Sequence, residues 1–489
     1  MEEQENACDC GCSRREFITT SGTATLGMSA LPFSSMLANE FKAPVMKNKT
    51  GASVKTVFLY PPSATFSDDP DGWWSWPGNQ YDAEGKQKEY TERIKKIGSG
   101  LDMNIGINDK SVADDGDVQK ITEELKSEKP DGLLLIMFYN RSRGHADTLI
   151  QAAEELGIPT IFYIGLGVMH GHWRSYNNRP GLYFIQSADN YEAIESGMRM
   201  INAGKRLGQS TLLSISDGEE RKVTKEAFFG ITVQPVQFSE YAEAFNSIAL
   251  TSKADDFLNR LSRNAIELNN ISKESLKNAT RAYFALNSLI EKYQADAVTM
   301  NCLRRGMLKP CIAFSVLNNQ LIPAVCENDL PAAYGQMIVQ AVLGRPGFQH
   351  NPAYDTEKNN YYASHCTCAT ELNGPGGADT KYRLTNFAHT NEGSCAIQVY
   401  WEPDEPATMI HYYTGEKPRI DIYSGRIEEP SYDDSFVAGC TTRVELKITN
   451  RTTADQVVGH HNILCYGDFA KRFKDFALLH KIEIMDPVE

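Results

Sequence analysis

Two carboxylates separated by a single residue are the first candidates for chemistry in this chain. Glu327 and Asp329 lie between an apolar run at 321–325, which predicts a buried strand, and a helical pattern that begins near Pro331 and ends at Gly344. The carboxyl end of a parallel strand is where α/β folds bind their ligands. The pair therefore predicts acid/base or metal-binding chemistry, although Asp329 alone is also in position to cap the helix.

Two loops rich in aromatic and histidine residues form a second set of candidates. Trp73, Trp74 and Trp76 lie in a loop with glycine and proline, and His172 and Trp173 follow a predicted strand at 160–164. Flat indole faces stack well on sugar rings, so the first loop predicts a sugar-binding surface, with a hydrophobic plug or subunit contact as the alternative. The second loop is interpreted as the polar mouth of a cleft, because its histidines lack a nearby third metal ligand.

The elements that must position these residues alternate between strand and helix from residue 54 onward. We expect an N-terminal α/β domain at 54–180, a second at 181–345 and a β-rich domain at 346–489, the last from strand-like runs at 361–366, 382–388, 396–401, 408–413, 420–423, 442–449 and 463–466. The predicted fold class is α/β: two doubly wound α/β domains followed by a β-rich, barrel-like C-terminal domain. No glycine-rich phosphate loop is present, so no nucleotide cofactor is expected.

Composition and the N-terminal residues restrict location and partners. The net charge of −14 over 489 residues disfavours nucleic acid, and no apolar run is long enough to span a bilayer. Arg14 and Arg15 precede Phe17 and a mildly apolar run, which predicts a twin-arginine export signal at 1–38, a linker at 39–53 and a periplasmic location. A disordered tail is the alternative. The eight cysteines from Cys302 onward are predicted to be buried thiols, although an exported protein can also form disulfides.

The order of several motifs resembles that of the L-fucose isomerase-like family, which includes L-fucose and L-arabinose isomerases. The motifs are IPAVCEND at 322–329, LGRP at 343–346, ASHC at 363–366 and GHHN at 459–462 followed by YGD at 466–468. The resemblance covers roughly residues 54–489. It implies aldose–ketose isomerisation of a small sugar, a divalent metal that is usually manganese, and a homo-oligomer.

Carried over motif by motif, the resemblance makes Asp329 a metal ligand and acid/base group. His461 becomes the C-terminal ligand, with His460 as its substitute, and His365 and His460 line the substrate pocket. The physics of the implied reaction is that a hard cation polarises a sugar carbonyl while a carboxylate transfers a proton.

One position departs from the family pattern. Arg305 stands where the family has its second catalytic carboxylate. Arginine neither ligates a cation nor acts as a base, so we expect it to pair with Glu327, Asp329 or an anionic sugar. Either Glu327 has taken over the missing role as ligand and catalytic group, or the isomerase chemistry is absent. The alternatives are then an exported glycoside hydrolase that uses a carboxylate pair on glycans, or a non-catalytic protein that binds a sugar or oligosaccharide.

Overall fold

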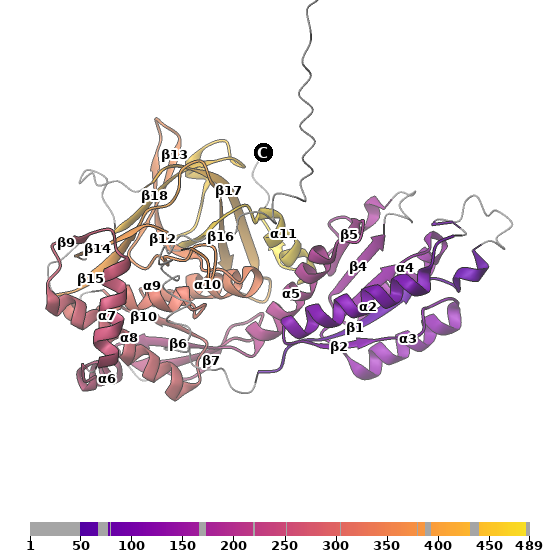
Figure 1. Cartoon of the computed structure of the whole chain (residues 1–489), viewed down its shortest axis with the longest axis horizontal. Coiled ribbons are helices and arrows are strands. Elements are labelled where there is room, and N and C mark those ends of the chain that lie inside the picture. The colour runs from indigo at the N-terminus through magenta and orange to yellow at the C-terminus, as the bar shows by residue number, and fades with distance from the viewer. Residues whose placement is uncertain are drawn as a thin grey trace, which may run out of the picture.

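The computed structural model describes residues 49–66, 77–78, 80–165, 173–218, 221–250, 252–303, 305–378, 380–386, 393–430 and 440–485. Over these ranges the chain forms two α/β units built on parallel sheets, followed by an antiparallel barrel (Figure 1). The predicted fold class is therefore confirmed. The predicted export signal at 1–38 lies outside the described residues.

The first sheet is entirely parallel and has helices on both faces. Val54, Phe58 and Leu134 pack beneath α2 and α5, whereas Val57 and Leu133 pack beneath α3 and α4. Its third strand is a continuous apolar run because a central parallel strand is buried on both sides. The strand order is β2 (Asn104–Ile107), β1 (Ser53–Leu59), β3 (Gly132–Met137), β4 (Thr160–Gly165) and β5 (Leu182–Ser187); the helices are α2 (Ala83–Gly100), α3 (Asp115–Glu128), α4 (Arg143–Glu155) and α5 (Tyr191–Gly208).

The second sheet is parallel except for one short edge strand. Its order is β11 (Ala324–Cys326), β10 (Ala297–Met300), β6 (Thr211–Ser216), β8 (Thr232–Gln237) and β7 (Thr224–Lys225), with β7 antiparallel to β8. The accompanying helices are α6 (Phe238–Ser247), α7 (Ser252–Asn264), α8 (Lys273–Tyr293), α9 (Cys311–Asn319) and α10 (Leu330–Leu343). The helical pattern that begins near Pro331 predicts α10.

The C-terminal domain is a closed six-stranded barrel. Around the barrel the order is β16 (Pro406–Tyr413), β19 (Asn462–Tyr466), β12 (Phe348–Asp355), β13 (Asn360–His365), β18 (Thr442–Ile448) and β17 (Arg419–Pro430), and β17 pairs with β16 to close it. Closure leaves none of these strands with an unpaired edge. Helix α11 (Ala470–Leu479) then packs against β5 of the first sheet, and Figure 1 shows it between the barrel and β5. The last strand, β20 (Glu483–Ile484), pairs in parallel with β17.

Three sequence predictions need correction. The expected boundary between residues 180 and 181 places β5 in the second domain, but β5 pairs in parallel with β4 and completes the first sheet. The runs at 382–388 and 396–401 were assigned to the barrel. They instead form a separate three-stranded sheet, β15 (Cys395–Val399), β14 (Tyr382–Asn386) and β9 (Leu268–Asn269), beside the second α/β unit. The barrel strand β12 was missed, because its polar residues and proline hide the alternation typical of strands.

Helix α10 joins the second sheet to the barrel. It contacts β10 and β11 on one side, β16 and β19 on the other, and α5 as well. Its residues from Ala332 to Val342 are almost all buried, as expected for a helix that is apolar on every face. Asp329 caps its first turn and Gly344 ends it in the left-handed conformation, with φ 63°. Among the described residues, no helix combines the length and apolar character needed to cross a bilayer.

Candidate functional site

Four polar side chains converge where the carboxyl ends of β10 and β11 meet one end of the barrel. Glu327 and Asp329 follow β11, His365 ends β13 and His461 precedes β19. Glu327 Oε2 lies 3.5 Å from His461 Nε2, and Glu327 Oε1 lies 3.6 Å from His365 Nε2. Asp329 Oδ2 accepts a hydrogen bond of 2.8 Å from His461 Nδ1. The structure therefore brings the two carboxylates together with His365 and with His461, which lies 132 residues after Asp329.

The backbone on both sides of the site is in the left-handed region. Glu327, Asn328 and His461 have φ of 67°, 55° and 59°. Such a conformation costs a non-glycine residue about 1–2 kcal/mol and persists only where neighbouring contacts hold it. Asn328 supplies two of those contacts: its N–H donates to the Met300 carbonyl at 3.1 Å, and its Oδ1 accepts from Ser214 at 2.8 Å. The turn is thereby fixed with the Glu327 carboxylate facing the barrel end.

Asp329 has both a structural and a site role. Its Oδ1 accepts the Ala332 N–H at 2.9 Å and caps α10, while its Oδ2 bonds His461. Although burial alone raises the pKa of Asp329, the hydrogen bonds from His461 and Ala332 outweigh burial and lower that pKa. The two sequence interpretations of Asp329, as a cap and as a site residue, therefore describe different oxygens of one carboxylate.

Glu327 and His365 influence each other's protonation. The contact with His365 lowers the pKa of Glu327 against the effect of burial. Burial disfavours a charged His365, but the Glu327 carboxylate overrides it and raises the pKa of that imidazole to about 9. Glu327 is therefore an ionised carboxylate at neutral pH, which is the form that binds cations.

At this site, two buried imidazole nitrogens have no hydrogen-bond partner among the described residues. They are His365 Nε2 and His461 Nε2, on side chains that are 1% and 2% exposed. Both face Glu327 at distances too long for a hydrogen bond. A buried polar atom without a partner costs roughly 1–3 kcal/mol, so a group bound between these two nitrogens and the carboxylate would be stabilised.

The donor atoms fit a single metal ion. One donor atom each from Glu327, His460 and His461 lies within 4.8 Å of the others. His460 is exposed, and its ring centroid lies 4.0 Å from that of His461. Because His461 donates its Nδ1 proton to Asp329, its Nε2 keeps a lone pair for a cation, an arrangement common among metal-binding histidines. The predicted ligands Glu327, Asp329 and His461 are thus brought together, but Asp329 lies on the far nitrogen of His461 and His460 joins the donor set.

Arg305 does not pair with the site carboxylates, and that sequence expectation is wrong. Its guanidinium forms an ion pair with Asp217, which follows β6, and donates through Nε to the Asn301 carbonyl at 2.9 Å. The guanidinium carbon also lies 3.7 Å from the centroid of the Phe238 ring. Asp217 and the Phe238 ring therefore stabilise the positive charge of Arg305 beside the end of β6, so that charge is not paired with Glu327.

The other predicted substrate-binding residues have different outcomes. Trp73, Trp74, Trp76 and His172 lie outside the described residues. Trp173 is only 5% exposed, packs beside Tyr176 and belongs to the core under the first sheet, so its assignment to a cleft mouth is wrong. His365 lies at the site, yet it is buried and faces Glu327 rather than solvent.

Sequence reasoning missed a hydrogen-bonded chain inside the barrel that supports His461. Asn462 Oδ1 is 3.0 Å from His411 Nδ1, Asn462 Nδ2 donates to the Tyr361 hydroxyl at 3.3 Å, and that hydroxyl is 2.7 Å from His350 Nε2. A Cβ at Gly459, whose φ is 98°, would lie 2.5 Å from His411 Nδ1. Only glycine fits there, which explains the first residue of the GHHN motif.

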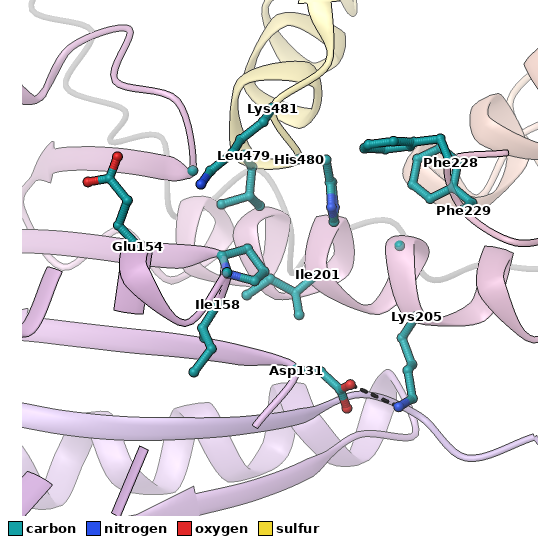
Figure 2. Close-up of a pocket in the computed structure, with 14 residues that line it drawn as sticks. Asp131, Glu154, Ile158, Ile201, Lys205, Phe228, Phe229, Leu479, His480 and Lys481 are labelled. Carbon is teal, nitrogen blue, oxygen red and sulfur yellow. Dashed lines mark hydrogen bonds and ion pairs between the residues drawn. The ribbon is translucent and has the colours of Figure 1, made fainter. Parts of the chain in front are cut away.

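The hollow drawn in Figure 2 lies elsewhere, between the amino ends of the first-sheet strands and the C-terminal segment. Its volume is about 360 Å³, and its lining includes Asp131, Lys205, Phe229 and His480. Lys205 is paired with Asp131 at 2.8 Å, drawn as the dashed line, and His480 Nε2 contacts the Met200 carbonyl at 3.0 Å. These polar groups are engaged within the protein, and the hollow is interpreted as a seam between domains.

The described cysteines are buried thiols without disulfides, as predicted. They are Cys302, Cys311, Cys326, Cys366, Cys368, Cys395, Cys440 and Cys465.

Comparisons with known proteins do not assign the chain to a family. No protein-family model matches it, and no curated protein matches it. Among solved structures, an ABC sugar transporter (periplasmic sugar binding protein) from Legionella pneumophila matches with 13% sequence identity over 59% of this chain and 94% of that chain. The TM-score is 0.17, which is too low to support an inference about fold or function.

Proposed function

We propose that the protein is a metal-dependent enzyme of the L-fucose isomerase-like type that interconverts an aldose and a ketose of a small sugar. The observation that carries the proposal is the donor set of Glu327, His460 and His461 within 4.8 Å, with Asp329 bonded to the far nitrogen of His461. A divalent cation bound there would polarise the carbonyl and adjacent hydroxyl of a sugar. Manganese is the cation that the motif resemblance implies.

The residues divide into those that can reach a substrate and those that orient them. Glu327 is 24% exposed and His460 is exposed, whereas His365 and His461 are buried and both oxygens of Asp329 are engaged by Ala332 and His461. Glu327 turns its two oxygens to different partners, Oε2 to His461 and Oε1 to His365. One oxygen can therefore ligate while the other takes the proton that moves between the two sugar carbons, with His365 as its neighbour.

The missing family carboxylate is compatible with this assignment. Arg305 is neutralised by Asp217 and lies over Phe238, so it places no unpaired positive charge against a cation at Glu327. Glu327 then takes over the role of the absent carboxylate, which was one of the two outcomes expected from the sequence.

The glycoside-hydrolase alternative has less support. Hydrolysis of a glycosidic bond uses two carboxyl groups that both face the bond. Both oxygens of Asp329 are occupied, by the Ala332 N–H and by His461. Asp329 therefore acts as an orienting group and not as a nucleophile or base.

Solvent exchange is the sharpest test of the proposal. The purified protein with Mn²⁺ is incubated in D₂O with a panel of aldopentoses and deoxyhexoses, and NMR follows deuterium entry at C2 together with ketose formation. We expect exchange with at least one aldose, its loss in Glu327→Gln and its retention in the matched control Glu240→Gln, which lies on α6. No exchange with any aldose, or full exchange in Glu327→Gln, would overturn the proposal.

A further inference from the structure

A second group of potential metal ligands lies directly behind the Glu327 site. Cys326 ends β11 and Cys366 follows β13, on either side of His365, and the three residues are 0%, 3% and 1% exposed. One donor atom from each lies within 4.8 Å of the other two. Cys366 Sγ is 3.8 Å from His365 Nδ1. Nothing in the proposed reaction uses either thiol.

Further thiols surround this group. Cys302, Cys311 and Cys440 are buried in the same core as Cys326 and Cys366. Five buried thiols thus share the core that borders His365. Buried cysteines often act simply as small apolar residues, but here two of them lie within metal-ligand range of one buried imidazole nitrogen and three more lie in the same core.

We propose that Cys326, His365 and Cys366 bind a thiophilic metal ion, Zn²⁺ in the first instance, with one neighbouring thiol available as the fourth ligand. In tetrahedral zinc sites with bond lengths of about 2.3 Å to sulfur and 2.0 Å to nitrogen, two sulfur ligands lie about 3.8 Å apart and a sulfur and a nitrogen ligand about 3.5 Å apart. The contact of 3.8 Å between Cys366 Sγ and His365 Nδ1 is close to this separation, and the whole set needs a contraction of at most about 1.3 Å.

Charge balance supports an ion in this buried position. On binding, the two thiols and the imidazole Nδ1 release the protons that they carry to solvent. The two thiolates cancel the charge of Zn²⁺, so these three ligands with the ion carry no net charge and avoid the cost of burying an isolated ion, and a third thiolate as the fourth ligand would add one negative charge. Sulfur ligands also separate this site from the Glu327 site, because thiolates select zinc over manganese.

His365 would connect the two sites. When Nδ1 ligates zinc, the remaining ring proton must lie on Nε2, which faces Glu327 Oε1 at 3.6 Å. The zinc site would then fix the tautomer and orientation of the residue that contacts Glu327. The proposal itself does not depend on isomerase activity, because zinc binding by Cys326, His365 and Cys366 is measured without any sugar substrate.

The test uses Co²⁺ as a spectroscopic substitute for zinc in the chelator-treated, reduced full-length protein. We expect a sulfur-to-cobalt charge-transfer band that saturates at one equivalent and disappears when Zn²⁺ is added. The band should be lost in Cys326→Ala and Cys366→Ala and kept in Cys465→Ala, a buried thiol of β19 outside this group. Absence of the band in the wild-type protein, or its persistence in Cys326→Ala, would overturn the proposal.

A second measurement covers the case in which the cysteine variants fail to fold. X-ray absorption at the zinc edge of the loaded wild-type protein should show at least two sulfur neighbours at about 2.3 Å. A first shell of oxygen and nitrogen alone would overturn the proposal. The Mn²⁺-dependent exchange described above involves no sulfur, so failure of either proposal is visible independently of the other.

Discussion

Replacing Asp329 by asparagine separates its helix-capping role from its site role. Asparagine caps helices as well as aspartate, so the amide Oδ1 can keep the Ala332 N–H. The amide NH₂ is then the group left facing His461 Nδ1, which must accept instead of donate. The imidazole proton moves to Nε2, the nitrogen that faces Glu327 at 3.5 Å, and the lone pair is no longer directed at the cation.

The expected size of the effect follows from this geometry. Loss of a carboxylate that orients a metal-binding histidine weakens metal affinity about 10- to 100-fold, or about 1.4–2.7 kcal/mol. Because the cap is kept, Asp329→Asn should lower the free energy of unfolding by no more than about 1 kcal/mol. Asp329→Ala removes the cap as well, which costs about 1 kcal/mol, and leaves Nδ1 of His461 without a partner, which costs roughly 1–3 kcal/mol more.

The assay combines a Mn²⁺ titration, followed by the electron paramagnetic resonance signal of the free ion, with urea unfolding of the metal-free protein. Unchanged Mn²⁺ affinity in Asp329→Asn would refute the orienting role and leave Asp329 as a cap. A loss far beyond about 100-fold would refute it in the other direction, because it would make Asp329 a direct ligand.

Three further predictions concern parts of the fold that hold or border the site. Arg305→Met should lower the free energy of unfolding by about 1 kcal/mol, because it removes the ion pair with Asp217 and the contact with the Phe238 ring. It should change Mn²⁺ affinity by no more than about twofold. A tenfold change would show that Arg305 faces the cation. Gly344→Ala should cost about 1 kcal/mol in urea unfolding, because alanine must adopt φ 63° at the end of α10, and an unchanged midpoint would contradict that strain. Burial lowers the pKa of His480 below its unfolded value near 6.5. The free energy of unfolding should therefore fall below pH 6.5 by up to about 1.4 kcal/mol per pH unit. His480→Gln keeps a donor for the Met200 carbonyl and should reduce this dependence of stability on pH.

Those parts of the fold that depend on local pattern are predictable from the sequence. The apolar run of β3 predicts a central strand, and the aspartate, proline and glycine around α10 predict both of its ends. The position of Glu327 and Asp329 after a parallel strand predicts that they lie at a sheet edge, and the GHHN motif adds His461 by resemblance. These inferences need only neighbouring residues or the order of motifs along the chain.

Interactions between distant segments are not predictable in this way. The partner of Arg305 is Asp217, 88 residues earlier, and nothing local to Arg305 favours it over Glu327. Membership of β5 in the first sheet depends on hydrogen bonds to β4, which a strand pattern does not specify. Trp173 follows a strand in a loop-like sequence, yet its ring packs beside Tyr176 in the core. The gathering of thiols around His365 likewise arises from four elements that no spacing rule connects.

The central claim is that Glu327, His460 and His461 bind a divalent cation. Mn²⁺ titration of the chelator-treated wild-type protein, beside Glu327→Gln and Cys326→Ala, tests it most directly, because manganese avoids thiolates and reports on the carboxylate–imidazole site alone. We predict about one Mn²⁺ per chain in the wild type and in Cys326→Ala, and none in a folded Glu327→Gln. An absence of Mn²⁺ binding in the wild type, or equal binding in Glu327→Gln, would contradict the account.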